Sequence, residues 1–501
     1  MTDSTKEFRT GAGSPAGEQE VMPFFEGILS KSAAETVIEA FDPSTGRRRH
    51  VIPAGCAMDV DRAVASARRA FDAGRWSEAP PSFRKMTLHR LADLIESDAA
   101  TLDALDAGEM GKPVSVAFCN SAGAGGLMRF YAEAVDKVTG AVFGSDKSSF
   151  VAQRRVPRGV VAAVVPWNFP TFCAVLKIAP ALAAGNCVVL KPSELSSRSA
   201  IRLALLALQA GVPVGVFNVV PGLGETVGQA LGLHMDVDML TFTGSTAVGK
   251  QMLQYAGRSN MKVVTAECGG KSPHVVFADG VDLDVAATWI SQMLLTNQGQ
   301  ICSVGSRLLV QRSIESTIVE KVTARLRQIV MGGALDPKTT FGPLASAQQC
   351  ARVMQYIESA QEDGAQLVTG GRRALPKSGG YFVEPTLFRA VPPIARIARE
   401  EIFGPVLSVI PFDDEAQAIR IANDTIYGLG AYVWTANLST GMRMAKGIRS
   451  SVCINAAAPM GEGPGHAFSS EPAGQSGIGA EGGLAGMESY LRRQLIWFNH
   501  A

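Results

Sequence analysis

The chain has 501 residues, and its 47 Lys and Arg against 46 Asp and Glu give a formal net charge of +1. Hydrophobic residues make up 47% of the chain and charged residues 19%. This composition excludes an intrinsically disordered chain, and the balanced charge argues against nucleic-acid binding through a basic surface. At roughly 150 residues per domain, the length predicts about two to four domains. The 52 glycines exceed the average usage of about 7%, which points to turns, tight packing or close approach of the backbone to a ligand.

The eight cysteines are widely spaced without a CxxC pair, and the six histidines form no HExxH motif. A disulfide scaffold and a metal site are therefore not expected. Residues 1–20 are polar and lack an apolar stretch, so we interpret them as a mobile leader and not as a signal peptide. The longest uncharged run, 159–176, contains Pro166, Asn168 and Pro170, which would break a membrane helix. The sequence thus predicts a cytoplasmic protein without a membrane partner.

The first elements in chain order are helices, predicted from apolar residues at three- and four-residue spacing over 61–73, 82–99 and 119–135. Short Val-rich runs then indicate strands buried on both faces at 159–165, 186–190, 216–220, 238–242, 262–266 and 274–277. The segments between them predict helices at 173–184, 196–210, 225–233 and 246–256. This alternation is typical of an α/β fold with a doubly wound parallel sheet, which binds ligands beyond the carboxyl ends of its strands.

A second α/β unit follows in the sequence. We expect its helices near 283–297, 313–331, 346–362 and 414–423, and its strands near 306–311, 366–370 and 405–411. The boundary between the units is predicted near 269–275, after two consecutive glycines. The later segment 455–486 is rich in Gly, Pro and Ala.

Two nucleotide-binding motifs are incomplete. The segment 244–250 resembles a phosphate-binding loop, but Gln251 stands where that loop needs a hydroxyl to bind magnesium. A GxGxxG pattern that starts at Gly222 fails at Val227. Gly244 and Ser245 still lie between a strand and a helix, where backbone N–H groups favour a phosphate. An ordinary turn between strand and helix explains them equally well.

Three further residues suit catalysis, and each also has a structural explanation. Cys302 lies among small and polar residues, where a nearby helix N-terminus would favour the thiolate, although a buried structural cysteine is as good an interpretation. Glu267 ends a strand beside two glycines. It can act as a general base there, or it can be a structural residue in an ion pair. Asn168 follows a strand between prolines, where its amide can donate to an oxyanion or form a turn.

Taken together, these segments resemble the aldehyde dehydrogenase superfamily of the hydrolytic, NAD(P)-dependent type. The matching motifs occur in the family's order over roughly residues 40 to 495: PWNFP (166–170), KPSE (191–194), FTGSTAVGK (242–250), ECGGKSP (267–273), NQGQIC (297–302) and EEIFGPV (400–406). The resemblance implies oxidation of an aldehyde to a carboxylic acid through a cysteine thiohemiacetal and a thioester, with water as the final acceptor.

The resemblance also implies catalytic roles. Cys302 matches the nucleophile, and the amide of Asn168 and the Cys302 backbone N–H match the oxyanion hole. Glu267 matches the general base that activates water, and Lys177 and Glu481 match a pair credited with proton relay, or else a structural ion pair. Relatives that pass the acyl group to coenzyme A typically lack a Glu at position 267, so hydrolysis is favoured. One alternative is an enzyme that has lost hydride transfer and catalyses acyl transfer or thioester hydrolysis. The other is a structural or binding protein built on the same fold.

For the cofactor, the resemblance implies NAD and leaves NADP open. A carboxylate at Glu194 accepts a hydrogen bond from the ribose 2′-hydroxyl and repels a 2′-phosphate, whereas Lys191 can still pair with that phosphate. The matched cofactor-binding residues are Trp167, Lys191, Ser193, Glu194, Gly244, Ser245, Gly269, Glu401 and Phe403.

The implied substrate tunnel has a mixed aromatic and aliphatic lining: Phe169, Phe172, Leu176, Thr296, Ile301, Ser303 and Phe468. Many relatives have Trp where this chain has Leu176, so the aromatic box that holds trimethylammonium groups is incomplete. We therefore expect a medium aliphatic or aromatic aldehyde. Cys268, Ala480 and the segment 467–470 depart from the family's usual residues.

The resemblance divides the chain into three parts. It implies a coenzyme-binding domain over 21–139 and 159–270, a catalytic domain over 271–470, and an oligomerisation segment over 140–158 and 486–499. The alternating residues 489–497 suit an edge strand, which would invite a partner chain. A homodimer or homotetramer is therefore expected.

Overall fold

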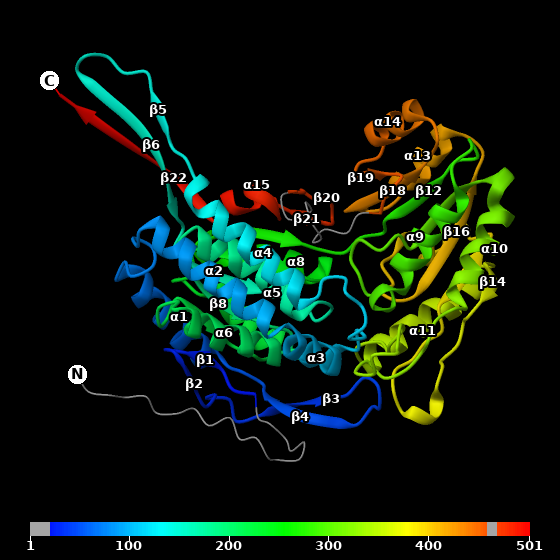
Figure 1. Cartoon of the computed structure of the whole chain (residues 1–501), viewed down its shortest axis with the longest axis horizontal. Coiled ribbons are helices and arrows are strands. Elements are labelled where there is room, and N and C mark those ends of the chain that lie inside the picture. The colour runs from blue at the N-terminus through cyan, green and yellow to red at the C-terminus, as the bar shows by residue number, and fades with distance from the viewer. Residues whose placement is uncertain (1–20, 458–467, 501) are drawn as a thin grey trace.

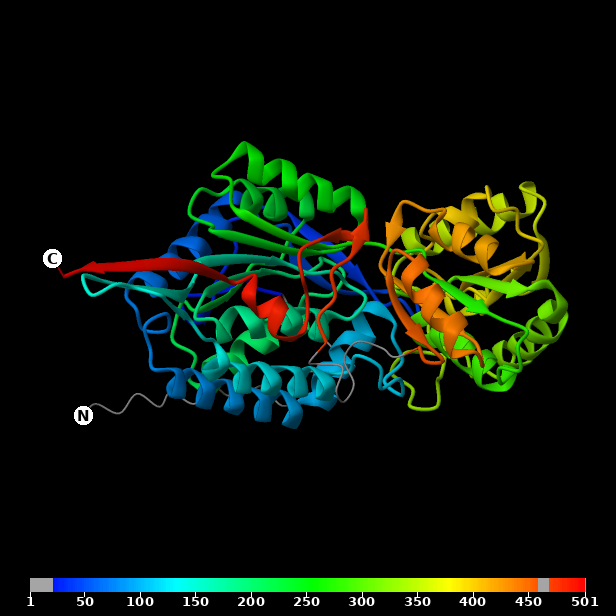
Figure 2. The same ribbon diagram turned by 90° about the horizontal axis from the view of Figure 1, so that it is seen from above.

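The computed structural model describes residues 21–457 and 468–500. The predicted leader, 1–20, lies outside the described residues. Residues 458–467, which belong to the segment rich in Gly, Pro and Ala, lie outside them as well. Two layered α/β bodies lie side by side, and a narrow arm projects from the first of them (Figures 1 and 2).

The first body is built on an eight-stranded sheet with the order β2-β1-β9-β8-β7-β10-β11-β21. Its five central strands are parallel, and every residue of β7 and β8 is buried, as the continuous apolar runs predict. These strands are β7 (Val160–Val164), β8 (Cys187–Lys191), β9 (Phe217–Val219), β10 (Met239–Thr243) and β11 (Val263–Glu267).

The edges of this sheet add antiparallel strands to the predicted parallel sheet. β1 (Phe24–Phe25) joins β9 antiparallel and forms a hairpin with β2 (Ile28–Leu29), while β21 (Gly477–Ile478) joins β11 antiparallel. These two-residue strands are too short to give an apolar run in the sequence. A separate hairpin, β3 (Val37–Phe41) with β4 (Arg48–Pro53), was also not predicted.

Helices cover this sheet, and α1 packs against β7, β8 and β9, whereas α2, α4 and α5 contact one another. The helix predicted at 225–233 begins as a π-helical turn, Gly224–Gly228. The helices are α1 (Ala57–Asp72), α2 (Pro81–Ser97), α3 (Ala99–Met110), α4 (Ser121–Ala134), α5 (Pro170–Ala183), α6 (Arg198–Ala210), α7 (Gln229–Leu233) and α8 (Thr246–Arg258), with a 3-10 turn at Val135–Lys137.

Helix α3 was not predicted because its inner face is polar. Asp106 is buried and its Oδ2 accepts a hydrogen bond from the Thr171 N–H at 3.1 Å, at the start of α5. Glu109 is buried as well, and its Oε2 accepts from the Arg198 N–H at 3.2 Å, at the start of α6. These carboxylates satisfy N–H groups that have no partner inside their own helices. The same polar residues erase the apolar periodicity on which a helix prediction depends.

The second body is built on a seven-stranded sheet with the order β14-β15-β16-β13-β12-β18-β19. All neighbours in it are parallel except β14 and β15. Its strands are β12 (Pro273–Val276), β13 (Arg307–Gln311), β14 (Gln366–Thr369), β15 (Thr386–Arg389), β16 (Val406–Phe412), β18 (Gly430–Trp434) and β19 (Ser451–Ile454).

The helices of the second body are α9 (Leu283–Leu295), α10 (Glu315–Leu326), α11 (Ala347–Glu362), α12 (Arg396–Arg399), α13 (Glu415–Asn423) and α14 (Leu438–Gly447). Short 3-10 turns lie at Thr296–Gly299, Arg312–Ile314 and Pro376–Ser378. Buried Arg307 ties this body together, because its guanidinium donates to the carbonyls of Lys271, Ile421 and Ala422 at 2.8–2.9 Å. The chain passes from the first sheet to the second between Glu267 and Pro273.

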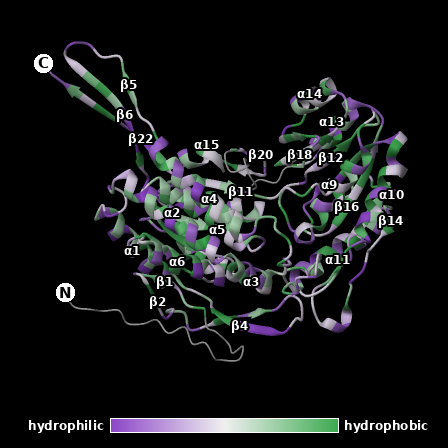
Figure 3. Ribbon diagram, viewed as in Figure 1, coloured by the Kyte–Doolittle hydropathy of each residue, from purple (hydrophilic) through white to green (hydrophobic). Residues whose placement is uncertain are grey.

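The arm is a three-stranded antiparallel sheet with the order β22-β6-β5 (Figure 1). It consists of β5 (Ala141–Phe143), β6 (Ser149–Pro157) and β22 (Leu491–Asn499), the last preceded by α15 (Gly483–Glu488). A short pair, β17 (Tyr427–Gly428) and β20 (Ala473–Gly474), lies elsewhere in the second half of the chain. The arm carries hydrophobic residues between hydrophilic ones (Figure 3), and the side chains of Val142 and Trp497 are 70% and 69% exposed. No helix of the described part of the chain is both long and apolar enough to span a membrane.

Candidate active site

A cavity of about 360 Å³ lies where the carboxyl ends of the central strands of the first body face the second body. Residues that were predicted from widely separated motifs line it together. These are Trp167, Asn168, Phe169, Phe172, Leu176, Gly244, Ser245, Glu267, Gly269, Ile301, Cys302, Ser303, Glu401, Phe403 and Glu481.

The turn before Cys302 is held by amide side chains. Asn297 and Gln298 have the left-handed φ values of 48° and 55°, a conformation that costs free energy in non-glycine residues. The Asn297 Nδ2 donates to the Asn168 carbonyl at 2.8 Å, and the Asn168 Nδ2 donates to the Gln300 carbonyl at 2.9 Å. Asn168 and the turn that presents Cys302 are thereby locked to each other. One N–H of the Asn168 amide is engaged in this contact, which leaves the other for a ligand.

Cys302 also depends on a close approach of the backbone. A Cβ added at Gly270 would lie 2.4 Å from the Cys302 carbonyl oxygen, and one added at Gly269 would lie 2.4 Å from Oε2 of Glu401. Side chains at either position would push the turn that carries Cys302, or the Glu401 carboxylate, away. Gly269 and Gly270 are therefore two of the 52 glycines for which the structure leaves no room for a side chain.

The environment of Cys302 opposes ionisation. Removal from bulk water raises the pKa of the Cys302 thiol to about 12, and the nearby carboxylates Glu401 and Glu267 add to the shift. These effects act against the thiolate in the ligand-free chain, in the opposite direction to the helix N-terminus that the sequence interpretation considered. The negative carboxylates outweigh the backbone N–H of Ser303, which acts in the opposite direction.

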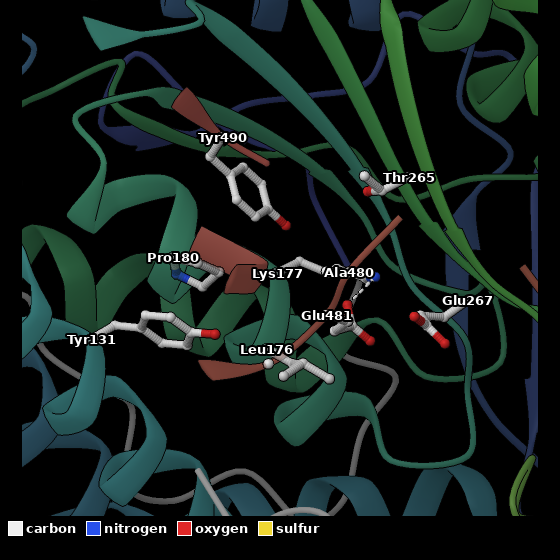
Figure 4. Close-up of a pocket in the computed structure, with 11 residues that line it drawn as sticks. Tyr131, Leu176, Lys177, Pro180, Thr265, Glu267, Ala480, Glu481 and Tyr490 are labelled. Carbon is white, nitrogen blue, oxygen red and sulfur yellow. Dashed lines mark hydrogen bonds and ion pairs between the residues drawn. The ribbon is translucent and has the colours of Figure 1, made fainter. Parts of the chain in front are cut away.

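Glu267 ends β11 and is buried. Burial raises its pKa well above the ordinary range, the charge of Glu481 raises it further, and Lys177 lowers it. Lys177, whose side chain is 1% exposed, forms an ion pair with Glu481 and also donates to the Phe242 carbonyl at 3.4 Å. The charges of Glu481 and Lys177, drawn with Glu267 in Figure 4, thus both act on the pKa of Glu267, and the two carboxylates also act on the pKa of Cys302.

On the opposite side of the cavity, Ser245 caps helix α8, and its Oγ accepts from the Val248 N–H at 3.3 Å. Trp167 and Phe403 meet edge to face with ring centroids 5.3 Å apart. Glu401 accepts a hydrogen bond from the Gly270 N–H at 3.2 Å, and burial raises its pKa to about 7. The helix N-terminus suits a phosphate. The aromatic pair suits a flat ring, and the buried carboxylate suits the hydroxyls of a ribose.

Three predicted cofactor residues lie outside the lining of this cavity, at the end of β8: Lys191, Ser193 and Glu194. The Lys191 Nζ lies 4.0 Å from Oε2 of Glu194 and donates to the Pro192 carbonyl at 2.9 Å. The Glu194 side chain is 34% exposed, so it is available to a ligand.

Thr296 and Phe468 are not among the described residues that line the cavity, contrary to the sequence interpretation. The Thr296 hydroxyl donates to the Gln292 carbonyl at 2.7 Å at the end of α9, which fixes it to its own helix. Phe468 is 62% exposed. Leu176, Phe169 and Phe172 do line the cavity, and Phe118 packs edge to face on Phe169 at 5.4 Å.

Several lining residues were missed in the sequence because no motif marks them. From α11, Gln349 Nε2 donates to the Phe403 carbonyl at 2.7 Å and Arg352 donates to the Glu401 carbonyl at 2.6 Å, which together fix the backbone of the 401–403 segment. The remaining unpredicted residues that matter for the shape of the cavity are Phe118, Cys119, Cys173 and Tyr432. Among the described residues, no cluster of three or more His, Cys, Asp or Glu could hold a metal ion.

The protein has a two-sheet α/β fold in which a thiol and carboxylates gather in one cavity at the carboxyl ends of its strands, where enzymes of this fold class bind their ligands. The model of the Aldehyde dehydrogenase family matches residues 29–496, and the chain belongs to this family.

Relatives and solved structures agree. The chain is 42% identical to the NADP/NAD-dependent aldehyde dehydrogenase PuuC of Escherichia coli over 95% of each chain. It is similar to the crystal structure of an indole-3-acetaldehyde dehydrogenase in complex with NAD+, with a TM-score of 0.92 and 45% identity, covering 95% of this chain and 96% of that one. The aldehyde dehydrogenase KauB of Pseudomonas aeruginosa gives the same TM-score and coverage with 46% identity.

Proposed function

We propose that the chain oxidises an aldehyde to a carboxylic acid with NAD as the hydride acceptor and water as the final acyl acceptor. The observation that carries this proposal is the convergence of Cys302, Asn168 and Glu267 on one cavity. A nucleophile, an oxyanion donor and a general base are the three groups that this chemistry needs.

The residues present fit a nicotinamide cofactor. Ser245 at the N-terminus of α8 would bind the pyrophosphate, and Glu401 would bind the nicotinamide ribose. Trp167 and Phe403 would hold the nicotinamide ring. Gly244 lies beside Ser245 at the pyrophosphate site, and Gly269 leaves room for the Glu401 carboxylate. Lys191, Ser193 and Glu194 would hold the adenosine ribose. The similar structure in complex with NAD+ and the relative that uses both NADP and NAD support NAD, with NADP as a second cofactor.

In the first step, the Cys302 thiol gives its proton to solvent water, and the thiolate sulfur attacks the aldehyde carbon to form a thiohemiacetal. The oxygen becomes an alkoxide, which the free N–H of Asn168 Nδ2 and the backbone N–H of Cys302 stabilise. A bound nicotinamide would supply the acceptor for the hydride of this carbon. Loss of the hydride leaves a thioester on Cys302.

In the second step, Glu267 removes a proton from a water molecule that adds to the thioester carbon. The C–S bond then breaks, the carboxylic acid leaves and the Cys302 sulfur is free again. The raised pKa of Glu267 suits this role, because a carboxylate of higher pKa is a stronger base. Lys177 and Glu481 would return Glu267 to its charged form, and the ion pair between them and their effect on the pKa of Glu267 support this role.

The lining of the cavity supports a medium aliphatic or aromatic aldehyde. Phe118, Phe169, Phe172, Leu176 and Ile301 present apolar surface to the substrate, and the carboxylates of the cavity are those already assigned to catalysis and cofactor binding. The names of similar proteins include indole-3-acetaldehyde dehydrogenase and aminoacetaldehyde dehydrogenase. An apolar lining favours the aromatic aldehyde over the charged amine, because an ammonium group would lose its hydration without a partner.

The test is the appearance of NADH absorbance with a panel of aldehydes: hexanal, phenylacetaldehyde, indole-3-acetaldehyde and 3-aminopropionaldehyde. We expect kcat/KM to be highest for the two aromatic substrates and lowest for the amine. Cys302→Ala is the control and should be inactive with all four. Turnover by Cys302→Ala, or none by the wild type with either NAD or NADP, would refute the proposal, and a preference for the amine would refute the substrate class.

We also propose that the arm joins copies of the chain into a homodimer or homotetramer. Its two edge strands, β5 and β22, end the sheet on either side, and each carries exposed apolar residues. With this arm as the oligomerisation segment, the coenzyme-binding and catalytic domains would be the two sheet-based bodies. The cytoplasmic location stays a prediction of the sequence.

A further inference from the structure

Lys112 is a buried cation that the proposed reaction does not use. It follows helix α3, and the residue is 3% exposed. Its Nζ donates to the Val116 carbonyl at 3.2 Å and to the Phe118 carbonyl at 3.1 Å. One ammonium group therefore binds two carbonyls of the loop that joins α3 to α4, and it holds this loop in one shape.

The same ammonium group lies beside an aromatic ring of the large cavity. The Lys112 Nζ is 5.9 Å from the centroid of the Phe169 ring, within the range of a cation–π attraction. Phe118 packs edge to face on that ring at 5.4 Å. Both phenylalanines line the large cavity, whereas Lys112 is not among the described residues that line it. Lys112 therefore contacts both members of the aromatic pair from outside the cavity.

The backbone directly after Phe118 is strained. Cys119 has the left-handed φ value of 49°, which is unfavourable for a residue with a Cβ. The Phe118 carbonyl belongs to the peptide bond between these two residues, so its hydrogen bond to Lys112 fixes the orientation of that peptide. Without this hydrogen bond, the peptide could rotate and Cys119 could return to a favoured conformation. Phe118 and Cys119, which both line the cavity, would then move.

The charge of Lys112 suits this contact. Burial lowers the pKa of Lys112, and the charges of Asp103 and Asp106 act in the opposite direction, in favour of the ammonium form. An ammonium group has three N–H donors and no acceptor. It can therefore bind two carbonyls and still attract an aromatic ring, which an apolar side chain of the same length cannot do.

We propose that Lys112 is the positioning residue that sets the preference of the cavity for aromatic over short aliphatic aldehydes. It fixes Phe118 against Phe169 as a rigid apolar wall, on which the flat ring of a substrate packs. A short aldehyde such as propanal does not fill a cavity of about 360 Å³ and depends less on this wall. Lys112 acts through Phe118 and does not touch the reacting atoms. The proposal rests on the proposed function and adds to it a residue that selects the substrate.

The test compares kcat/KM for phenylacetaldehyde with kcat/KM for propanal in Lys112→Met, which keeps the length of the side chain and removes the N–H donors. We expect the ratio of the two values to fall about tenfold, the size of one lost aromatic contact. The fall should come mostly from a higher KM for phenylacetaldehyde, and kcat/KM for propanal should equal that of the wild type. An unchanged ratio, whether both values fall together or neither does, would overturn the proposal.

Lys262→Met is the matched control. Lys262 is 6% exposed, and its Nζ donates to the Gly232 carbonyl and to the Ser259 hydroxyl, both at 2.7 Å. It is not among the described residues that line the large cavity, so loss of this buried ammonium group should leave the ratio unchanged. A similar fall in Lys262→Met would mean that any loosening of the fold changes the ratio, and would overturn the proposal.

A second variant tests the strained backbone. Glycine adopts a φ of 49° without the penalty of a Cβ, so Cys119→Gly should keep the peptide in place with less help from Lys112. Lys112→Met should therefore lower the ratio less in the Cys119→Gly background than in the wild type. An equal loss in both backgrounds would overturn the proposal. Should Lys112→Met not fold, Lys112→Gln takes its place in both comparisons with the same expected outcomes, because its side chain is one atom shorter and cannot bind both carbonyls.

The failure of this inference is distinguishable from a failure of the proposed function. If the wild type oxidises neither aldehyde with NAD or NADP, the proposed function is wrong and this inference falls with it. If the wild type oxidises both and the ratio is the same in Lys112→Met, the proposed function stands and only the role of Lys112 is wrong.

Discussion

The hydroxyl of Tyr432 donates a hydrogen bond of 2.9 Å to the carbonyl of Ser303, the residue that follows Cys302. Tyr432 lies on β18 in the second body, and its ring packs against the His274 ring with centroids 4.9 Å apart. The backbone after Cys302 is thereby anchored to strand β18 of the second sheet, whereas Asn297 and Asn168 anchor the backbone before it. Cys302 is held from both sides.

Tyr432→Phe should therefore loosen the nucleophile turn while leaving the ring in place. We expect kcat to fall with little change in KM, because the cofactor and aldehyde contacts stay intact. The free energy of unfolding should fall by about 1 kcal/mol for the lost hydrogen bond. Steady-state kinetics and thermal unfolding measure both effects, with Tyr255→Phe as the matched tyrosine control. An unchanged kcat would show that the contact does not position Cys302.

Glu267→Gln should separate the two halves of the reaction. The amide cannot take a proton from water, so hydrolysis of the thioester should slow by about 10² to 10⁴-fold. Formation of the thioester should continue, and stopped-flow absorbance should show one equivalent of NADH in a burst before slow steady turnover. Absence of the burst would place Glu267 in the first step instead.

The parts of the site that the sequence predicts are those that follow directly on strands. Asn168 comes after β7, Ser245 after β10, and Glu267 ends β11, so the parallel order of these strands is enough to bring them to one edge of the sheet. Short runs of apolar residues predict these strands. The family motifs then identify Cys302 and Glu401 on the second body.

The rest depends on contacts between the bodies that no local pattern records. Tyr432 lies inside an ordinary strand, and Phe118 lies in a loop before α4, so neither has a neighbour in the sequence that indicates a site. The buried carboxylates of Asp106 and Glu109 on α3 bind N–H groups at the N-termini of α5 and α6. Because these two residues are polar, they also interrupt the apolar period that would have indicated helix α3.

The raised pKa of Cys302 predicts the pH dependence of thiol reactivity. With a pKa of about 12, the rate of alkylation by iodoacetamide in the cofactor-free chain should still be rising at pH 10, where an ordinary thiol has levelled off. Glu401 has a pKa of about 7 and is charged above that pH, so it disfavours the thiolate there. Glu401→Gln should lower the pKa of Cys302 and speed alkylation at pH 9, by about tenfold for each unit of pKa.

Glu400→Gln is the matched control for this experiment. Glu400 is the adjacent residue, but its carboxylate is bound by Tyr356 and Arg396 and is not a cause of the Cys302 shift. In Glu400→Gln, the rate at which Cys302 is alkylated at pH 9 should equal that of the wild type. Equal rates for Glu401→Gln and the wild type would mean that burial alone raises the pKa of the thiol.

The arm predicts a change of mass in solution. Trp497 and Leu495 are 69% and 58% exposed on β22, and Lys at both positions would place two charges on the proposed interface. Light scattering coupled to size exclusion should give a multiple of the 52.8 kDa chain for the wild type and a smaller species for the double variant. Ile394→Lys, at a residue 76% exposed outside the arm, is the control. A monomeric wild type, or an unaltered mass for the double variant, would contradict the role of the arm.

Glu194 predicts the choice between the two cofactors. Its carboxylate can accept the 2′-hydroxyl of NAD, and it repels the 2′-phosphate of NADP, while Lys191 lies 4.0 Å away and attracts that phosphate. Glu194→Gln removes the repulsion and keeps the size of the side chain. The ratio of kcat/KM for NADP to that for NAD should therefore rise by about tenfold, equivalent to 1.4 kcal/mol. Glu320→Gln, on α10 in the second body, should leave the ratio unchanged. If the ratio stays the same in Glu194→Gln, then Lys191 and the backbone, and not this carboxylate, set the preference.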